Sequence, residues 1–176
     1  MTTEGAMEKL HEAPRSFDDI ASFVKSRDCG SRTVREILAK KPAGTWTVRP
    51  EASVYEALHV MAEHNVGSLV VIDAGRVAGV ISERDYARKV ILIGKASRET
   101  FVHEIMSSPA VSVEPGSTVT QCMELMTGRF IRHLPVVESG TLVGCVSIGD
   151  VVKALIADQG QRIGQFEDYI RGSYPA

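Results

Sequence analysis

The stretch "GVISERDYARKVI" (Gly79–Ile91) returns at a shift of 65 residues as "GCVSIGDVVKALI" (Gly144–Ile156). The same glycine, serine and aspartate come back in the same places. They are Gly79, Ser82 and Asp85 in the first copy, and Gly144, Ser147 and Asp150 in the second. A serine and an aspartate three residues apart are therefore placed twice at the junction of a strand and a helix.

The shared stretch is part of a longer internal repeat. Pro50–Ile91 aligns with Pro115–Ile156 without a gap, and "VREIL" (Val34–Leu38) matches "VHEIM" (Val102–Met106) at a shift of 68. The first copy thus carries three extra residues near "KKPAG". The repeat is identified before the fold is assigned, because each copy is one structural unit and a missed repeat leads to a wrong fold.

Each copy predicts the order β-α-β-β-α. A short strand ("TWTV" or "VSV") precedes a helix whose apolar residues recur at i, i+3, i+4 and i+7, such as Val54, Ala57, Leu58 and Met61. Two strands, "SLVVI" with "RVAGVI" and "HLPVV" with "TLVGCV", flank a turn at Gly75 or Gly140, and a closing helix follows. Since one such unit buries little surface alone, we expect an α+β fold, an α/β sandwich of two repeats packed sheet to sheet with pseudo-twofold symmetry.

These boundaries predict four segments: an N-terminal extension (1–33), two repeats (34–96 and 97–157) and a C-terminal tail (158–176). Both tails show the pattern of short amphipathic helices. Ser16 and Asp19 form a possible capping box at the first, while Ile163, Phe166 and Ile170 share a face in the second. Two interpretations stay open: the tails cover the module, or they form a dimer or partner surface.

Composition excludes several classes of protein. The chain has 176 residues, 44% of them hydrophobic, and a net charge of −2, so neither nucleic acid nor an anionic membrane is an expected partner. No apolar run approaches the roughly 20 residues of a membrane span, and the first residues lack the apolar core of a signal peptide. Cys29, Cys122 and Cys145 are odd in number without a CxxC spacing, and the histidines are scattered, so no disulfide or metal site is predicted. A reduced, cytoplasmic protein is expected.

The Ser-x-x-Asp pairs have two interpretations. Ser53-x-x-Glu56 and Thr118-x-x-Gln121 need only a capping box, and the strand-end pairs can be the same device. The strand-end pairs use Asp in both copies, however, while the residues between them differ. A carboxylate beside free helix N–H groups also suits the neighbouring 2′- and 3′-hydroxyls of a ribose.

The doubled unit resembles a CBS-domain pair over about Val34 to Ala157. "GVISERD", "SERDYARKVI" and "RHLPVV…LVGCVSIGDVVKALI" carry the resemblance, which is closest to small stand-alone two-CBS proteins. It implies two clefts between the repeats, which hold adenosine compounds such as AMP, ADP, ATP, NAD or S-adenosylmethionine and need no metal. It also implies a non-catalytic signal-transduction module that forms homodimers.

The resemblance assigns residues to each part of the ligand. It implies that the ribose lies on Asp85 and Asp150, beside Ser82 and Ser147. It implies that the base lies near the first strand and the stretch before the second strand of each copy. Those residues are Thr47, Val48, Asn65, Val66, Gly67 and Ser68 in copy one, and Ser112, Val113 and Ile131 to Pro135 in copy two.

Phosphates next to aspartates require nearby cations. Arg132 and His133 stand where copy one has Gly67 and Ser68, and Arg84 stands where copy two has Gly149. We therefore expect the copy-two cleft, with Asp150, Arg132 and His133, to take the phosphates, and Arg84 to reach across to them. Lys89 is a further candidate on the same helix as Arg84.

Three functions are compatible with these features. The first is a sensor that binds an adenosine nucleotide and transmits its state to an unidentified protein. The second is a dimerisation scaffold without a ligand. The third is a nucleotide-processing enzyme, against which stands the lack of a Walker loop, a metal-ligand cluster or a Ser-His-Asp arrangement.

Overall fold

The protein was analysed as a computed structural model that describes residues 32–41 and 44–158. The elements in chain order are α3 (Val34–Leu38), β1 (Thr47–Val48), α4 (Val54–Glu63), β2 (Ser68–Asp73), β3 (Arg76–Ser82), α5 (Glu83–Lys89), the 3₁₀ turn η2 (Ile91–Ile93), α6 (Val102–Ile105), α7 (Val119–Arg129), β4 (His133–Glu138) and β5 (Thr141–Ser147). A last helix covers residues 148–158. The two predicted tail helices lie outside the described residues.

Each repeat contains one antiparallel hairpin, β2–β3 or β4–β5. Its turn has two successive residues with positive φ, Ala74–Gly75 in the first and Ser139–Gly140 in the second, which is the backbone of a type I′ turn. The predicted glycine turns are therefore confirmed. The strand before each hairpin is shorter than predicted. β1 pairs with β2 in parallel over two residues, and in copy two only Val113 bridges to Val136.

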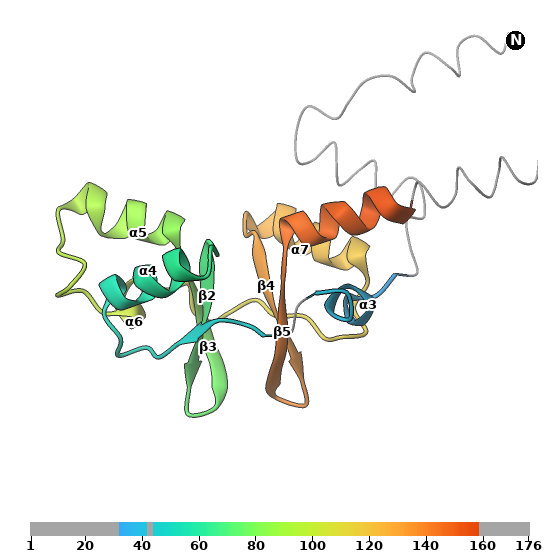
Figure 1. The fold of residues 1–176 in the computed structure, drawn as a ribbon, viewed down its shortest axis with the longest axis horizontal. Coiled ribbons are helices and arrows are strands. Elements are labelled where there is room, and N and C mark those ends of the chain that lie inside the picture. Colours follow the sequence, from blue (N-terminus) through green and yellow to red (C-terminus); the bar gives the residue numbers. More distant parts are fainter. Residues whose placement is uncertain (1–31, 42–43, 159–176) are drawn as a thin grey trace, which may run out of the picture.

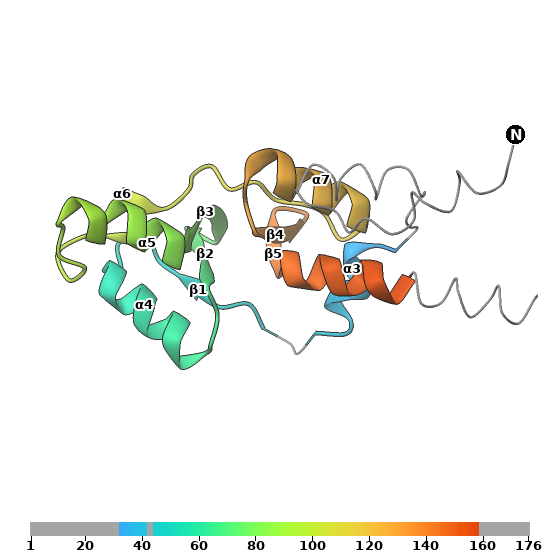
Figure 2. The same cartoon turned by 90° about the horizontal axis from the view of Figure 1, so that it is seen from above.

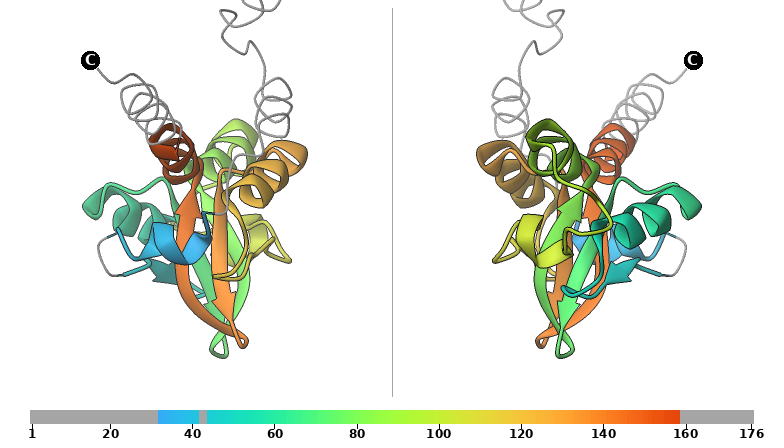
Figure 3. Two further views of the ribbon diagram at one scale, coloured as in Figure 1. Left: turned by 90° about the vertical axis from the view of Figure 1, so that its right-hand side faces the viewer. Right: turned by 90° about the vertical axis from the view of Figure 1, so that its left-hand side faces the viewer.

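The two sheets lie side by side in the middle of the molecule, and the helices cover their outer sides (Figure 1). Seen along the long axis, the two hairpins overlap and their turns lie at the same end (Figure 3). Strands β3 and β5 contact each other across the centre. The predicted α/β arrangement of two repeats, sheet to sheet, is confirmed.

The first helix of each repeat packs against the other repeat. Val34 and Ile37 of α3 are buried in the core of copy two, whereas Val102 and Ile105 of α6 are buried in the core of copy one. In Figure 2, α3 accordingly lies in the half of the molecule that contains β4, β5 and α7, and α6 lies next to α5 in the other half. The packed units therefore differ from the segments 34–96 and 97–157, which stay a prediction about the sequence repeat.

Matching backbone hydrogen bonds hold both exchanged helices. Val34 N donates to Ser117 O at 2.9 Å, and its repeat equivalent Val102 N donates to Ala52 O at 2.9 Å. Because the same bonds recur at equivalent positions, both repeats place their first helix on the other repeat in the same way. It ties the two halves of the chain into one folding unit.

The repeated glycines of the second strands lie where the exchanged helices pass. A Cβ on Gly79 would stand 2.8 Å from both Met106 Sδ and the carbonyl oxygen of Ser107, just after α6. A Cβ on Gly144 would stand 2.7 Å from Leu38 Cδ2 at the end of α3. Only glycine leaves room for these close approaches.

Gly79→Ala should destabilise the protein by about 1–3 kcal/mol, since the backbone oxygen of Ser107 cannot move aside without losing its pairing with Val80. Urea unfolding followed by circular dichroism measures the change. Gly116→Ala is the matched control, because a Cβ there meets nothing within 4 Å. Equal stability of the two variants would contradict the packing described for Gly79.

Cys122 is fully buried in the copy-two core and Cys145 is half-buried in β5. Burial raises the pKa of both thiols to about 11, so both stay protonated near neutral pH. Cys122 is thus a small packing residue of the core, while Cys29 lies outside the described residues.

Candidate functional site

The Ser-x-x-Asp pairs form helix caps in both repeats. Ser82 N and Oγ donate to Asp85 Oδ2 at 3.1 and 2.6 Å, and Asp85 N donates back to Ser82 Oγ at 3.3 Å. Ser147 and Asp150 repeat this box, with bonds of 2.7 and 2.8 Å to Asp150 Oδ2. The capping interpretation is thus confirmed, and it also fixes the orientation of both carboxylates.

A cleft of about 660 Å³ opens beside Asp85, within the range of ligand pockets in proteins. Both repeats line it. Copy one contributes Gly67, Val80, Ser82, Glu83, Arg84, Asp85 and Arg88, and the second half of the chain contributes Ser107, Pro109, Ala110, Val111, Arg129, Phe130, Ile131, Arg132 and His133.

The cleft is basic although the protein as a whole is weakly acidic. Among the described residues, four arginines line it, against two carboxylates, Glu83 and Asp85. Lys89 balances the charge of Asp85, because its Nζ lies 2.8 Å from Asp85 Oδ1. A concentration of guanidinium groups in a concave site attracts anions and favours phosphate oxygens.

Backbone bonds fix the loops that carry these side chains. Ile148 N donates to Arg132 O at 2.9 Å, and in the first repeat Glu83 N donates to Gly67 O at 3.1 Å. Phe130 ends α7 in the left-handed conformation, so the chain turns sharply before Arg132. Arg84 Nη1 donates to Phe130 O at 3.4 Å, which brings Arg84 across to the loop of copy two.

Two of the expected phosphate-binding residues, Arg132 and His133, lie where the second repeat meets the first. His133 lies near Asp150, whose charge acts on its imidazole, so the expected grouping of Arg132 and His133 with Asp150 stays a prediction. Both residues also line the cleft that contains Asp85 and Arg84. The physical reason is that the repeats face each other, so the loop before β4 reaches the start of α5 in the other repeat. The expectation that Arg84 approaches these residues agrees with its contact to Phe130.

His133 and Lys89 differ from the expected phosphate cations. Burial lowers the pKa of His133, and the charge of Lys41 lowers it further, so this imidazole is neutral near pH 7 and offers hydrogen bonding rather than charge. Lys89 is held by Asp85 and by the carbonyl oxygen of Ile105 at 2.5 Å, and it does not appear among the lining residues.

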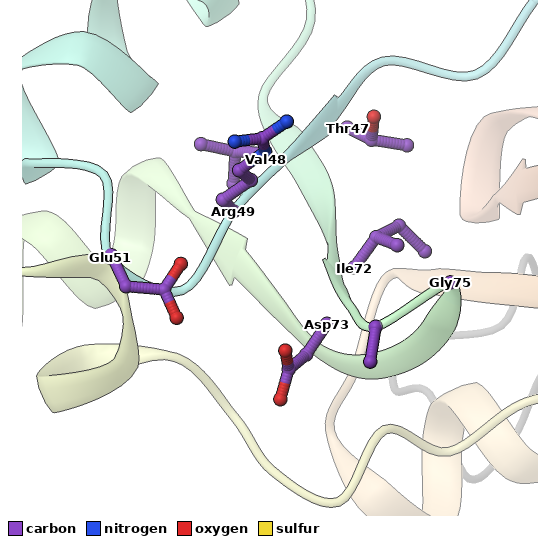
Figure 4. Close-up of a pocket in the computed structure, with 8 residues that line it drawn as sticks. Thr47, Val48, Arg49, Glu51, Ile72, Asp73 and Gly75 are labelled. Atoms are coloured by element: carbon purple, nitrogen blue, oxygen red, sulfur yellow. The ribbon is translucent and has the colours of Figure 1, made fainter.

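The residues expected at the base are divided among several places. Thr47 and Val48 line a separate pocket of about 600 Å³ beside the β2–β3 turn, together with Arg49, Glu51 and Asp73 (Figure 4). Ser112 and Val113 line its counterpart of about 720 Å³ in copy two. Gly67 and Ile131 line the Asp85 cleft, while Asn65, Val66, Ser68 and Pro135 do not.

Sequence reasoning did not find Arg129 or Phe130, and it favoured a solvated helix face for Arg88. Arg88 follows Asp85 by three residues and so shares its helix face, a spacing that could have pointed to it. Arg129 and Phe130 are positioned by the end of α7, which the repeat pattern did not predict. The segment before the first strand of copy two, Pro109 to Val111, was also missed.

Comparison with known proteins places the chain in a family. The CBS-domain model matches residues 34–91 and 102–157. The chain belongs to the CBS-domain family. CBS-domain pairs are in general regulatory modules that bind adenosine-containing ligands, and they are typically non-catalytic.

Solved CBS-domain structures share this fold. A protein with CBS domains from Burkholderia ambifaria MC40-6 is 46% identical, with a TM-score of 0.70 over 73% of this chain and 96% of that chain. The hexameric CBS-CP12 protein from bloom-forming cyanobacteria is 29% identical, with a TM-score of 0.62 over 70% of this chain and 72% of that one. The mitochondrial CBS domain-containing protein CBSX3 of Arabidopsis thaliana is 38% identical over 82% of this chain and 74% of its own length.

Within residues 32–41 and 44–158, no helix is long and apolar enough to cross a membrane. Over the same residues, no cluster of three or more histidine, cysteine or acidic side chains could hold a metal ion.

Proposed function

We propose that this CBS pair is a non-catalytic sensor that binds a phosphorylated adenosine ligand, of the AMP, ADP, ATP or NAD class, in the Asp85 cleft. It works in the cytoplasm, where the free thiols of Cys122 and Cys145 suit a reducing compartment. The observation that carries the proposal is the meeting, in one cleft of ligand size, of a carboxylate, an apolar wall and four arginines.

Each part of the lining suits one part of a nucleotide. Asp85 accepts hydrogen bonds from the ribose hydroxyls, next to the hydroxyl of Ser82. Val80, Val111 and Ile131 supply an apolar wall for the base. Phe130, whose side chain is 78% exposed, offers a ring face on which the base can stack.

The arginines bind the phosphates. Guanidinium groups bind phosphate oxygens through paired hydrogen bonds, and such charged bonds are stronger than neutral ones. Arg84 and Arg132 come from different repeats, so a phosphate chain held between them links the two halves of the module. Ligand binding then favours one packing of the repeats, which is the differential affinity that a sensor needs.

The signal passes to a partner protein through a homodimer. Exposed apolar side chains support a further interface: Leu92 and Ile93 of η2 are 76% and 60% exposed, and Ile156 of the last helix is 64% exposed. The hexameric CBS-CP12 relative supports assembly in the family. In this proposal the partner is an unidentified protein whose activity the dimer regulates.

A nucleotide panel tests the proposed function. AMP, ADP, ATP or NAD at 100 times its Kd should raise the free energy of unfolding by about 2.7 kcal/mol. The matching guanosine nucleotide at the same concentration should raise it by less. Asp85→Asn should weaken binding at least tenfold, through the loss of charged hydrogen bonds to the ribose. Asparagine can still accept the bonds of the cap, so the fold is kept.

Asp73→Asn is the matched control, because this exposed carboxylate lies at the β2–β3 turn. No response to any adenosine compound would favour the scaffold and refute the sensor. Nucleotide hydrolysis that disappears in Asp85→Asn would instead support an enzyme.

A further inference from the structure

The two signature aspartates have different lysine partners. Asp85 pairs with Lys89 on its own helix, four residues further along. Asp150 pairs with Lys41, which comes from the segment after α3 and lies 2.7 Å from Asp150 Oδ2. Lys41 also donates to the carbonyl oxygen of Cys145 at 3.0 Å.

The repeat shows on which side of Asp150 this lysine lies. Lys41 stands four residues after Ile37, and its counterpart Pro109 stands four residues after Ile105. Pro109 lines the Asp85 cleft, whereas Lys89 does not. By the same symmetry Lys41 lies on the side of Asp150 that corresponds to the Asp85 cleft, whereas Lys89 is not among the residues that line that cleft.

Lys41 and Asp150 form a partly buried ion pair. Its side chain is 35% exposed and that of Asp150 is 18% exposed, so water screens the pair only in part. Burial alone would raise the pKa of Asp150, but the hydrogen bonds from Lys41 and Ser147 outweigh it and hold the pKa below its ordinary value. Oδ2 of the ionised carboxylate is therefore engaged by both Lys41 and Ser147.

The Asp150 side also has fewer cations for phosphate. The repeat equivalents of Arg84, Arg88, Arg129 and Arg132 are Gly149, Lys153, His64 and Gly67. A ligand at Asp150 would have to displace Lys41 without the four guanidinium groups that line the other cleft.

We propose that Lys41 is an internal competitor of the ligand for Asp150, so that each chain binds one nucleotide, in the Asp85 cleft. The second cleft binds only when Lys41 leaves Asp150. This inference rests on the proposed function, since it concerns the same class of ligand. It makes Lys41 a residue that determines binding stoichiometry.

Isothermal titration with ATP tests the proposal. The wild-type chain should show one site, which Asp85→Asn weakens. Lys41→Met, which keeps most of the apolar stem, should show two sites, the second at least about tenfold tighter than in the wild type, as expected when a charged hydrogen bond no longer competes. The double variant Asp85→Asn/Lys41→Met should keep one site, and Lys40→Met should behave as the wild type.

Several results would overturn the proposal. Two equal sites in the wild type would refute the competition alone and leave the proposed function intact. One site in Lys41→Met would show that Lys41 does not compete. Weaker binding in that variant would show that Lys41 itself holds the ligand. If neither the wild type nor Lys41→Met binds any of AMP, ADP, ATP and NAD, the proposed function fails, and the inference fails with it.

Discussion

Replacing Arg84 and Arg132 together with glutamine should weaken ATP binding at least a hundredfold and leave adenosine binding almost unchanged. Both side chains line the Asp85 cleft from opposite repeats. Each charged hydrogen bond to a phosphate contributes about 1.5–3 kcal/mol, so the loss of two costs about 3–6 kcal/mol. Since 1.4 kcal/mol corresponds to a factor of ten, this loss spans two to four powers of ten.

Calorimetry with ATP, AMP and adenosine measures the effect. The double variant Arg35→Gln/Arg76→Gln is the matched control, because it removes the same charge from two exposed positions outside the cleft. The ion pair of Arg35 with Glu138 lies at the surface, so its loss should cost little stability. Equal losses for adenosine and ATP in the cleft variant would contradict a phosphate-binding role.

Ile105→Ala should destabilise the protein by about 2–5 kcal/mol, enough to unfold much of a marginally stable domain. Ile105 belongs to the sequence of the second repeat but is 1% exposed within the core of the first. The substitution leaves a cavity in the core that Ile105 shares with Val54, Leu69 and Ile81.

Urea denaturation gives the loss, and hydrogen exchange gives its location. Protection should fall most in α4, β2 and β3, which pack against α6. Ile91→Ala is the matched control, since this isoleucine is 57% exposed and its truncation should change stability by less than about 0.5 kcal/mol. Loss of protection confined to α7, β4 and β5 would contradict the exchange of first helices.

Much of the fold could be predicted from sequence because its signals are local. The glycines of both type I′ turns, the four capping boxes and the helical spacing around Val54 each depend on a few neighbouring residues. The repeat at a shift of 65 residues then predicts two equivalent units. Because each unit has an apolar sheet face to bury, the repeat also predicts that the two sheets pack together as a sandwich. Ser82 and Asp85 were located correctly at the strand-to-helix junction for the same reason.

The sequence could not show which repeat each first helix packs against. α3 and α6 carry the same apolar pattern, and a connection of this length allows packing on either repeat. The sequence also could not show that the loop before β4, with Arg132, reaches the Asp85 cleft. Nor could it show that the pKa of His133 is lowered, because this shift depends on burial and on the charge of Lys41.

The two signature aspartates are related by the repeat but have different charged neighbours. Asp85 faces arginines from both repeats, and Asp150 faces a lysine of its own chain. We propose that the Asp85 cleft takes the phosphorylated ligand while Lys41 competes for Asp150.

A crystal structure of the protein with saturating ATP tests the central claim most directly. We predict one nucleotide per chain, with its ribose hydroxyls on Asp85, its phosphates between Arg84 and Arg132, and Lys41 still on Asp150. A nucleotide ordered elsewhere, or an empty Asp85 cleft at saturating ATP, would contradict the account.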